Sequence, residues 1–88
     1  MTVYCVSYDL NKSGQNYVGL YEELKKYDNI HPLDSTCFVS TTETPTQVAA
    51  KLRARMDAND YMIVIKVSKP YDGWLSQTYW DWLNARTT

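Results

Sequence analysis

The chain has 88 residues, of which 44% are hydrophobic and 22% charged, and its formal net charge is -1. A chain of this length has room for one core, and its balanced charge argues against the strong positive field that sequence-independent nucleic-acid binding requires. Eight Tyr and three Trp supply more aromatic surface than so small a core can bury, so we expect some rings to serve an interface.

The cysteines and the hydropathy pattern indicate the cellular compartment of the protein. Cys5 and Cys37 lie in apolar runs without the spacing of a metal or redox motif, which favours buried free thiols and a reducing compartment. No stretch approaches the roughly 20 apolar residues that span a bilayer, and the start of the chain lacks a signal-peptide pattern. We therefore expect a cytoplasmic protein without membrane contact, folded as a single domain over residues 1–88.

Residues 3–10 form a β-branched and aromatic run that predicts the first strand. Strand alternation places Val3, Cys5, Ser7 and Asp9 on one face, and Tyr4, Val6, Tyr8 and Leu10 on the other. Ser, Gly and Asn dominate residues 11–16 and predict a loop, because these residues favour turns.

Tyr and Leu recur at helical spacing from residue 17 to residue 27 and predict the first helix, with Asn16 as its N-cap and Asp28-Asn29 as its end. Pro32 restrains the chain to an extended form, so we expect a short edge strand over residues 30–33. The tight connection Asp34-Ser35 then leads into a strand over residues 35–41, which completes a hairpin.

The second half of the chain begins with the segment Thr44-Pro45-Thr46-Gln47, which predicts a helix start with a capping box and proline at the first helical position. Asn59 offers a left-handed stop. The buried stripe of this helix would hold Val48, Ala49, Leu52 and Met56. Its solvated face would hold Lys51, Arg53 and Arg55, whose charges Asp57 and Asp60 balance. Residues 61–67 predict the last strand, and its run 62–65 is apolar enough to expect cover on both faces.

The predicted order of strand, helix, strand, strand, helix and strand is that of a ferredoxin-like α+β sandwich, with a core over residues 3–67 and both helices on one face of an antiparallel sheet. A second copy or the tail must hide the other face. A C-terminal aromatic helix over residues 72–84 can do part of this, since one of its faces carries Leu75, Tyr79, Trp82 and Leu83, with Ser76 as its cap and Trp80 pointing elsewhere. Packing on the core or on a partner subunit explains Trp74, Trp80 and Trp82 better than base stacking does.

Three segments carry a family resemblance: Val6-Ser7-Tyr8-Asp9-Leu10 ending the first strand, Asp34-Ser35-Thr36-Cys37-Phe38-Val39, and Asn59-Asp60 before the last strand. They resemble the small integration-subunit family of CRISPR systems. The chain is more similar still to the stand-alone, often phage- or plasmid-borne relatives known as SinR-like proteins, which have similar Trp-rich endings. The resemblance covers residues 3–67.

This resemblance implies a homodimer in which Asp9 faces its symmetry mate and shares a divalent metal such as Mg²⁺. Members related to the virulence-associated protein D group and to the CRISPR subunit have been assigned metal-dependent nuclease activity, although the subunit acts as a DNA-binding scaffold in spacer integration. Asp9 would then be the catalytic and metal-binding residue, with Tyr8, Lys12 and Ser35 lining the approach of RNA or DNA. Mg²⁺ needs only one or two carboxylates beside substrate phosphate, whereas an aspartate ending a strand is equally often a cap or turn residue.

Two features depart from the integration subunit. The loop over residues 11–16 has Lys12 as its one basic residue where the family is usually rich in arginine, and Asp34 replaces a glutamine-like polar residue. His31, the single histidine, has no obvious nucleophile or second metal ligand to act with it, so it is expected at the surface or at an edge of the sheet.

Two alternatives to a nuclease stay open. The first is a catalytically silent module that holds a nucleic acid, a nucleotide or a protein in the same dimer cleft or on its aromatic tail. The second is a mobile-element accessory protein that captures a host protein, with the tail tryptophans as its anchors: Trp74, Trp80 and Trp82.

Overall fold

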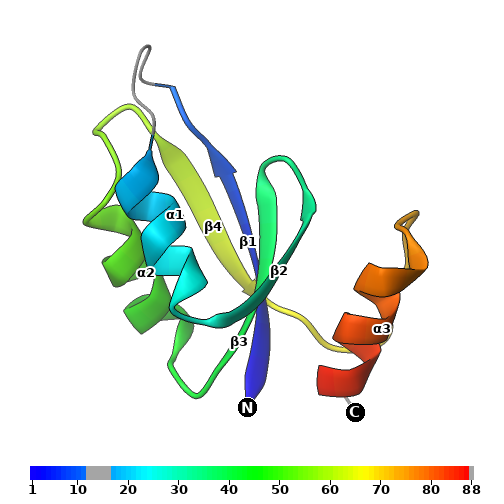
Figure 1. Ribbon diagram of the computed structural model, residues 1–88. Coiled ribbons are helices and arrows are strands. Elements are labelled where there is room, and N and C mark those ends of the chain that lie inside the picture. Colours follow the sequence, from blue (N-terminus) through cyan, green and yellow to red (C-terminus); the bar gives the residue numbers. More distant parts are fainter. Residues whose placement is uncertain (12–16, 88) are drawn as a thin grey trace.

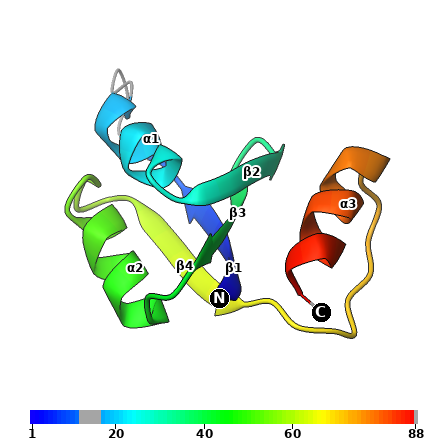
Figure 2. The ribbon, with the colours of Figure 1, turned by 60° about the horizontal axis from the view of Figure 1, so that its bottom comes forward.

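The computed structural model describes residues 1–11 and 17–87, which form four strands and three helices. In chain order these are β1 (Thr2–Asp9), α1 (Val18–Lys25), β2 (Asp28–Leu33), β3 (Thr36–Thr41), α2 (Pro45–Arg53), β4 (Tyr61–Lys66) and α3 (Gln77–Arg86). The strands form one antiparallel sheet in the order β2-β3-β1-β4, with α1 and α2 on one face and α3 across the other (Figures 1 and 2). The predicted ferredoxin-like α+β fold with a C-terminal helix is confirmed.

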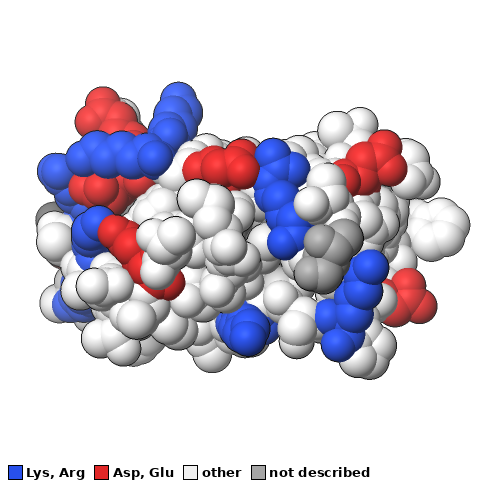
Figure 3. All heavy atoms as spheres, turned by 90° about the horizontal axis from the view of Figure 1, so that it is seen from below, with Lys and Arg blue, Asp and Glu red and all other residues white. Residues whose placement is uncertain are grey.

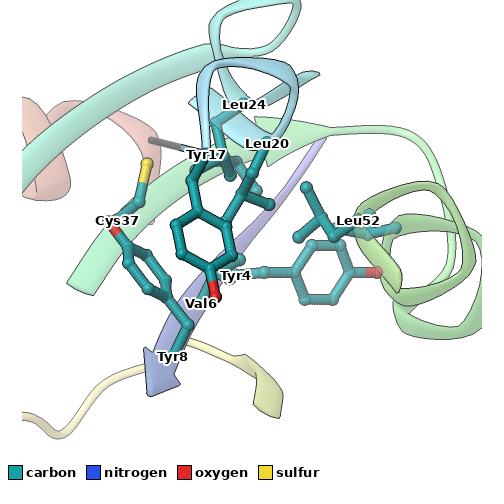
Figure 4. Close-up of a cluster of buried hydrophobic side chains, with 10 residues drawn as sticks. Tyr4, Val6, Tyr8, Tyr17, Leu20, Leu24, Cys37 and Leu52 are labelled. Atoms are coloured by element: carbon teal, nitrogen blue, oxygen red, sulfur yellow. The ribbon is translucent and has the colours of Figure 1, made fainter. Parts of the chain in front are cut away.

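The central strand β1 contributes side chains to the cores on both faces of the sheet, because successive side chains of a strand point to opposite sides. Tyr4, Val6 and Tyr8 pack under α1 and α2 in the main core, together with Tyr17, Leu20, Leu24, Cys37, Val39, Val48 and Leu52 (Figure 4). Val3, on the opposite face, is buried with Phe38 and Leu83 beneath α3. The two faces predicted for this strand are confirmed.

Helix α2 begins at the predicted capping box. The backbone N–H of Gln47 donates to Thr44 Oγ1 at 3.2 Å, and the backbone N–H of Thr44 donates to Gln47 Oε1 at 2.9 Å, with Pro45 at the first helical position. These bonds satisfy two of the N–H groups that a helix start leaves without an intrahelical partner.

We expect Thr44→Ala to lower the free energy of unfolding by about 1 kcal/mol, because it removes the acceptor for the N–H of Gln47. Thr44→Ser keeps the hydroxyl and should stay close to the wild type. Urea denaturation of the three proteins measures the difference, and equal midpoints for Thr44→Ala and Thr44→Ser would contradict it.

The predicted boundary between α1 and β2 was wrong, because strand pairing sets it. Asp28 and Asn29 are the first residues of β2 rather than the end of α1, because they pair with Ser40 and Val39 of β3. The helix therefore ends at Lys25. Pairing with a distant strand overrides what a local pattern of polar residues favours.

The predicted helix stop and helix cap also differ from the structure. Among the described residues other than glycine, Tyr17 alone has a positive φ, of 55°, and it occupies the N-cap position of α1. Asn59 is therefore not a left-handed stop, and α2 ends earlier, at Arg53. Asn16, predicted as the N-cap of α1, lies outside the described residues.

Strand β4 was expected to be covered on both faces, with a second copy or the tail over the second face, and helix α3 of the tail does not cover it. Tyr61, Ile63 and Ile65, which we call the β4 strip, are 70%, 54% and 51% exposed. They lie on the sheet face opposite α1 and α2, directly across from Asp9, Ser7 and Cys5 of β1. Helix α3 packs against the β1 and β2 side of this face and leaves the strip open.

Helix α3 is held by packing and by one ion pair. Leu83 is 2% exposed, and the ring of Trp82 stacks on Phe38 with centroids 6.3 Å apart. Arg86 lies over the Trp82 ring and bonds Asp28 at 2.7 Å. The helix starts at Gln77, later than predicted, and Ser76 occupies its N-cap position without a side-chain cap bond.

No helix in the described part of the chain is long and apolar enough to cross a membrane.

Candidate functional site

Asp9 is the last residue of β1 and is exposed on the face of the sheet that α1 and α2 leave free. It lies opposite Tyr61, and a hollow of about 270 Å³ beside it is lined by Ser7, Ile63 and other residues of these two strands. Within residues 1–11 and 17–87, no group donates a hydrogen bond to the Asp9 carboxylate. None of the described residues therefore engages this carboxylate.

The other predicted site residues do not gather around Asp9. The Tyr8 side chain is buried on the opposite face of the sheet, so it does not share a substrate approach with Asp9. Ser35 is exposed in the turn between β2 and β3, and its carbonyl accepts a hydrogen bond from the backbone N–H of Tyr8 at 3.0 Å. Lys12 lies outside the described residues.

Tyr8 instead pairs with the single histidine. Its hydroxyl lies 2.5 Å from His31 Nε2, and the two rings meet edge to face. Burial raises the pKa of Tyr8 to about 12, and burial lowers the pKa of His31 below its ordinary value. Both groups are therefore neutral near pH 7, and the contact is a hydrogen bond without charge. His31 is exposed on the edge strand, as predicted, but local sequence carries no signal for a partner 23 residues away.

Asp60, predicted to balance the charge of the solvated basic face of α2, is buried just before β4. Its carboxylate accepts hydrogen bonds from the Tyr17 hydroxyl at 2.6 Å and from the backbone N–H groups of Asn11 and Asp57, each at 2.7 Å. Burial alone would raise the pKa of Asp60, but these bonds and the nearby Arg53 outweigh it and hold the pKa below its ordinary value. Asp60 therefore joins the chain after β1 to the loop before β4.

The lowered pKa of Asp60 predicts a loss of stability in acid. A carboxyl group whose pKa is depressed by folding contributes its full stability above the unfolded-state pKa, near 3.8, and loses it as the pH falls through the depressed value. We expect the wild type to be more stable than Asp60→Asn at pH 7 and this difference to shrink below pH 3.8. Thermal unfolding from pH 2.5 to 7 measures it, and a difference that is constant with pH would contradict the prediction. Asp81→Asn, on the exposed surface of α3, is the matched control.

The three tail tryptophans have different surroundings. Trp74 is 98% exposed. Trp80 and Trp82 are half-buried, and Trp80 stacks on Tyr71 with centroids 6.1 Å apart, so it does not point away from the core as predicted. Trp74 is thus the tryptophan that a partner can reach without moving α3.

Comparison with known proteins adds no family. No family model, curated protein or solved structure matches this chain. The resemblance to the small integration subunit of CRISPR systems stays a prediction that rests on the segments quoted for it.

The charge around Asp9 decides what the site can hold. In the described part of the chain, no three His, Cys, Asp or Glu side chains gather as metal ligands. Figure 3 shows the end of the molecule at which β1 begins, away from Asp9, and basic and acidic side chains are interspersed there without a field of one sign. Asp9 offers a hard oxygen donor of the kind that Mg²⁺ prefers.

Proposed function

We propose that the protein is a homodimeric, metal-dependent nuclease in which two Asp9 carboxylates, one from each chain, hold Mg²⁺ and act on RNA or DNA. The observation that carries this proposal is the exposed carboxylate of Asp9, to which no described residue donates a hydrogen bond, beside an open apolar strip on the same sheet face. A cytoplasmic location fits the proposal, because Cys5 and Cys37 are both free thiols.

The β4 strip supports a second copy of the chain as its cover. Large exposed apolar side chains gathered in one place are typical of protein interfaces. A two-fold interface is self-complementary, so a residue near its axis meets its own copy. Asp9 lies directly opposite Tyr61 at one end of the strip. An axis near this end would bring the two Asp9 carboxylates together.

Two facing carboxylates favour a cation between them, because like charges at short distance repel each other. When bound, Mg²⁺ supplies positive charge that stabilises the oxygens of a phosphodiester. The part of the protein is to present the two carboxylates at the ends of rigid strands and to leave the adjoining face open to the substrate. The formal net charge of -1 fits a substrate held through the cation rather than through many Lys and Arg contacts.

The test is cleavage of end-labelled single- and double-stranded RNA and DNA by the purified protein with Mg²⁺, with Mn²⁺ or with EDTA, beside sedimentation of the same sample. We expect a dimer that cleaves at least one of these substrates only when a divalent cation is present. Cleavage that survives EDTA, or a monomer with full activity, would contradict the proposal.

Trp74 favours a second candidate function, that of a binding module without catalysis. A tryptophan that is 98% exposed is typical of the anchors that dominate protein interfaces. In this candidate the protein captures a host protein, and Trp74→Ala weakens capture without changing stability. Equal inactivity of the wild type on every substrate would favour this candidate over the nuclease.

A further inference from the structure

A second hollow, of about 480 Å³, opens on the same sheet face as Asp9, between the sheet and the segment that leads into α3. Its floor includes Cys5, Ser7 and Thr36, and aromatic rings of the sheet and the tail line its walls: Phe38, Tyr71 and Trp80. The volume is within the range of about 300 to 1,000 Å³ that is usual for small-molecule sites. Ser7 lines this hollow and also the smaller one beside Asp9, so the two adjoin.

Two hydroxyl groups lie side by side on the floor of this hollow. Ser7 of β1 and Thr36 of β3 are direct cross-strand partners, and both are half-buried. Neither side chain has a hydrogen-bond partner in the described part of the chain. Each hydroxyl can donate one hydrogen bond and accept others, so the pair suits the edge of a heterocycle that carries a donor next to an acceptor.

The charge and shape of the hollow restrict its ligand further. Its lining includes no Lys or Arg among the described residues, and its one charged side chain is Asp72. A negatively charged group would therefore find no counter-charge inside. Aromatic walls favour a flat ring, because rings pack face to face or edge to face with one another.

We propose that this hollow binds a nucleobase, with the flat ring between the aromatic walls and its hydrogen-bonding edge on Ser7 and Thr36. Asp9 is two residues beyond Ser7 on the same face of β1, about 7 Å along the strand. The phosphate of the same strand of nucleic acid would then lie outside the hollow, toward Asp9. The inference rests on the proposed function for its ligand, a single-stranded nucleic acid, and names the part of that ligand that is recognised.

Cys5 provides a direct probe of occupancy. Cys5 lines the hollow and is half-buried, whereas Cys37 is fully buried on the other face of the sheet. Burial raises the pKa of the Cys5 thiol, so alkylation is measured at alkaline pH. A ligand in the hollow covers Cys5 and slows its alkylation, which mass spectrometry follows residue by residue.

The experiment adds adenosine, guanosine, cytidine or uridine, each without phosphate and in EDTA, and measures the alkylation rate of Cys5 and the tryptophan fluorescence. We expect at least one nucleoside to slow alkylation in a saturable way, with ribose alone giving no effect. The double variant Ser7→Ala, Thr36→Val should bind about tenfold more weakly, because two hydrogen bonds are lost. Thr46→Val, on the exposed surface of α2, is the matched control and should bind like the wild type.

Three outcomes would count against this nucleobase site. Nucleosides that leave both signals unchanged would overturn the proposal, and so would equal affinity in the double variant once thermal unfolding has shown that it is folded. In the third outcome, Trp74 of a second copy fills the hollow. Dilution would then separate the copies and speed up the alkylation of Cys5, while nucleosides would have no effect, and this result would also overturn the proposal. Because the assay contains no metal and no phosphate, it measures nucleoside binding apart from the cleavage proposed for Asp9. Binding without any cleavage by the wild type would thus refute the nuclease alone.

Discussion

Asp9→Asn is expected to reduce metal-dependent cleavage by at least about 100-fold, since a bound cation supplies several kcal/mol of charge stabilisation in such reactions. Asparagine has nearly the size of aspartate but lacks the charge that holds a divalent cation. The carboxylate has no donor in the described part of the chain, so its loss should not change the melting temperature. The measurement is the initial rate of cleavage with Mg²⁺, beside thermal unfolding and sedimentation.

Two further variants separate chemistry from assembly. Asp81→Asn removes the same charge from the exposed surface of α3 and should keep full activity. Ile63→Glu places a charge in the middle of the β4 strip, so it should give a folded monomer with little cleavage. A dimer that stays intact in Ile63→Glu would place the interface elsewhere, and an active Asp9→Asn would refute the role of the carboxylate.

Leu83→Ala is expected to lower the free energy of unfolding by about 3 kcal/mol, because it empties a buried position between α3 and the sheet. Leu83 is 2% exposed and packs with Val3 and Phe38. A loss of this size is a large part of the total stability of a small domain. Urea denaturation followed by far-ultraviolet circular dichroism measures it, and the tryptophan fluorescence of the same samples reports on α3.

Leu33→Ala is the matched control, because Leu33 is 55% exposed at the end of β2. The same change in side chain should cost less than about 1 kcal/mol there, since little apolar surface is removed from the interior. Equal losses in the two variants would show that α3 does not bury Leu83 in solution.

The docking of α3 changes how the tail is tested for partner capture. Deleting the chain from residue 72 onward removes Leu83 and exposes Val3 and Phe38, so the deletion would lower stability as well as remove Trp74. Trp74→Ala leaves α3 in place and removes the exposed ring alone. It is therefore the variant that isolates recognition from folding.

The candidate site was predictable only in part. Strand alternation in residues 3–10 correctly placed Asp9 on the face opposite Tyr8, yet the resemblance grouped the two in one substrate approach. The bond from Tyr8 to His31 joins β1 to β2 across β3, and the bonds of Asp60 join residues up to 49 apart. No local sequence pattern encodes such pairs, because each pair depends on how distant strands and loops pack against one another.

The sequence by itself determined the features that depend on near neighbours in the chain. The capping box of Thr44 and Gln47 and the period-2 alternation of β1 need only residues a few positions apart, and both are as predicted. The tertiary structure alone decided that β2 starts at Asp28, that Asp60 is buried and that α3 covers Phe38 but not Ile63. These outcomes depend on contacts with segments that are distant in the chain, and such contacts can override a local preference.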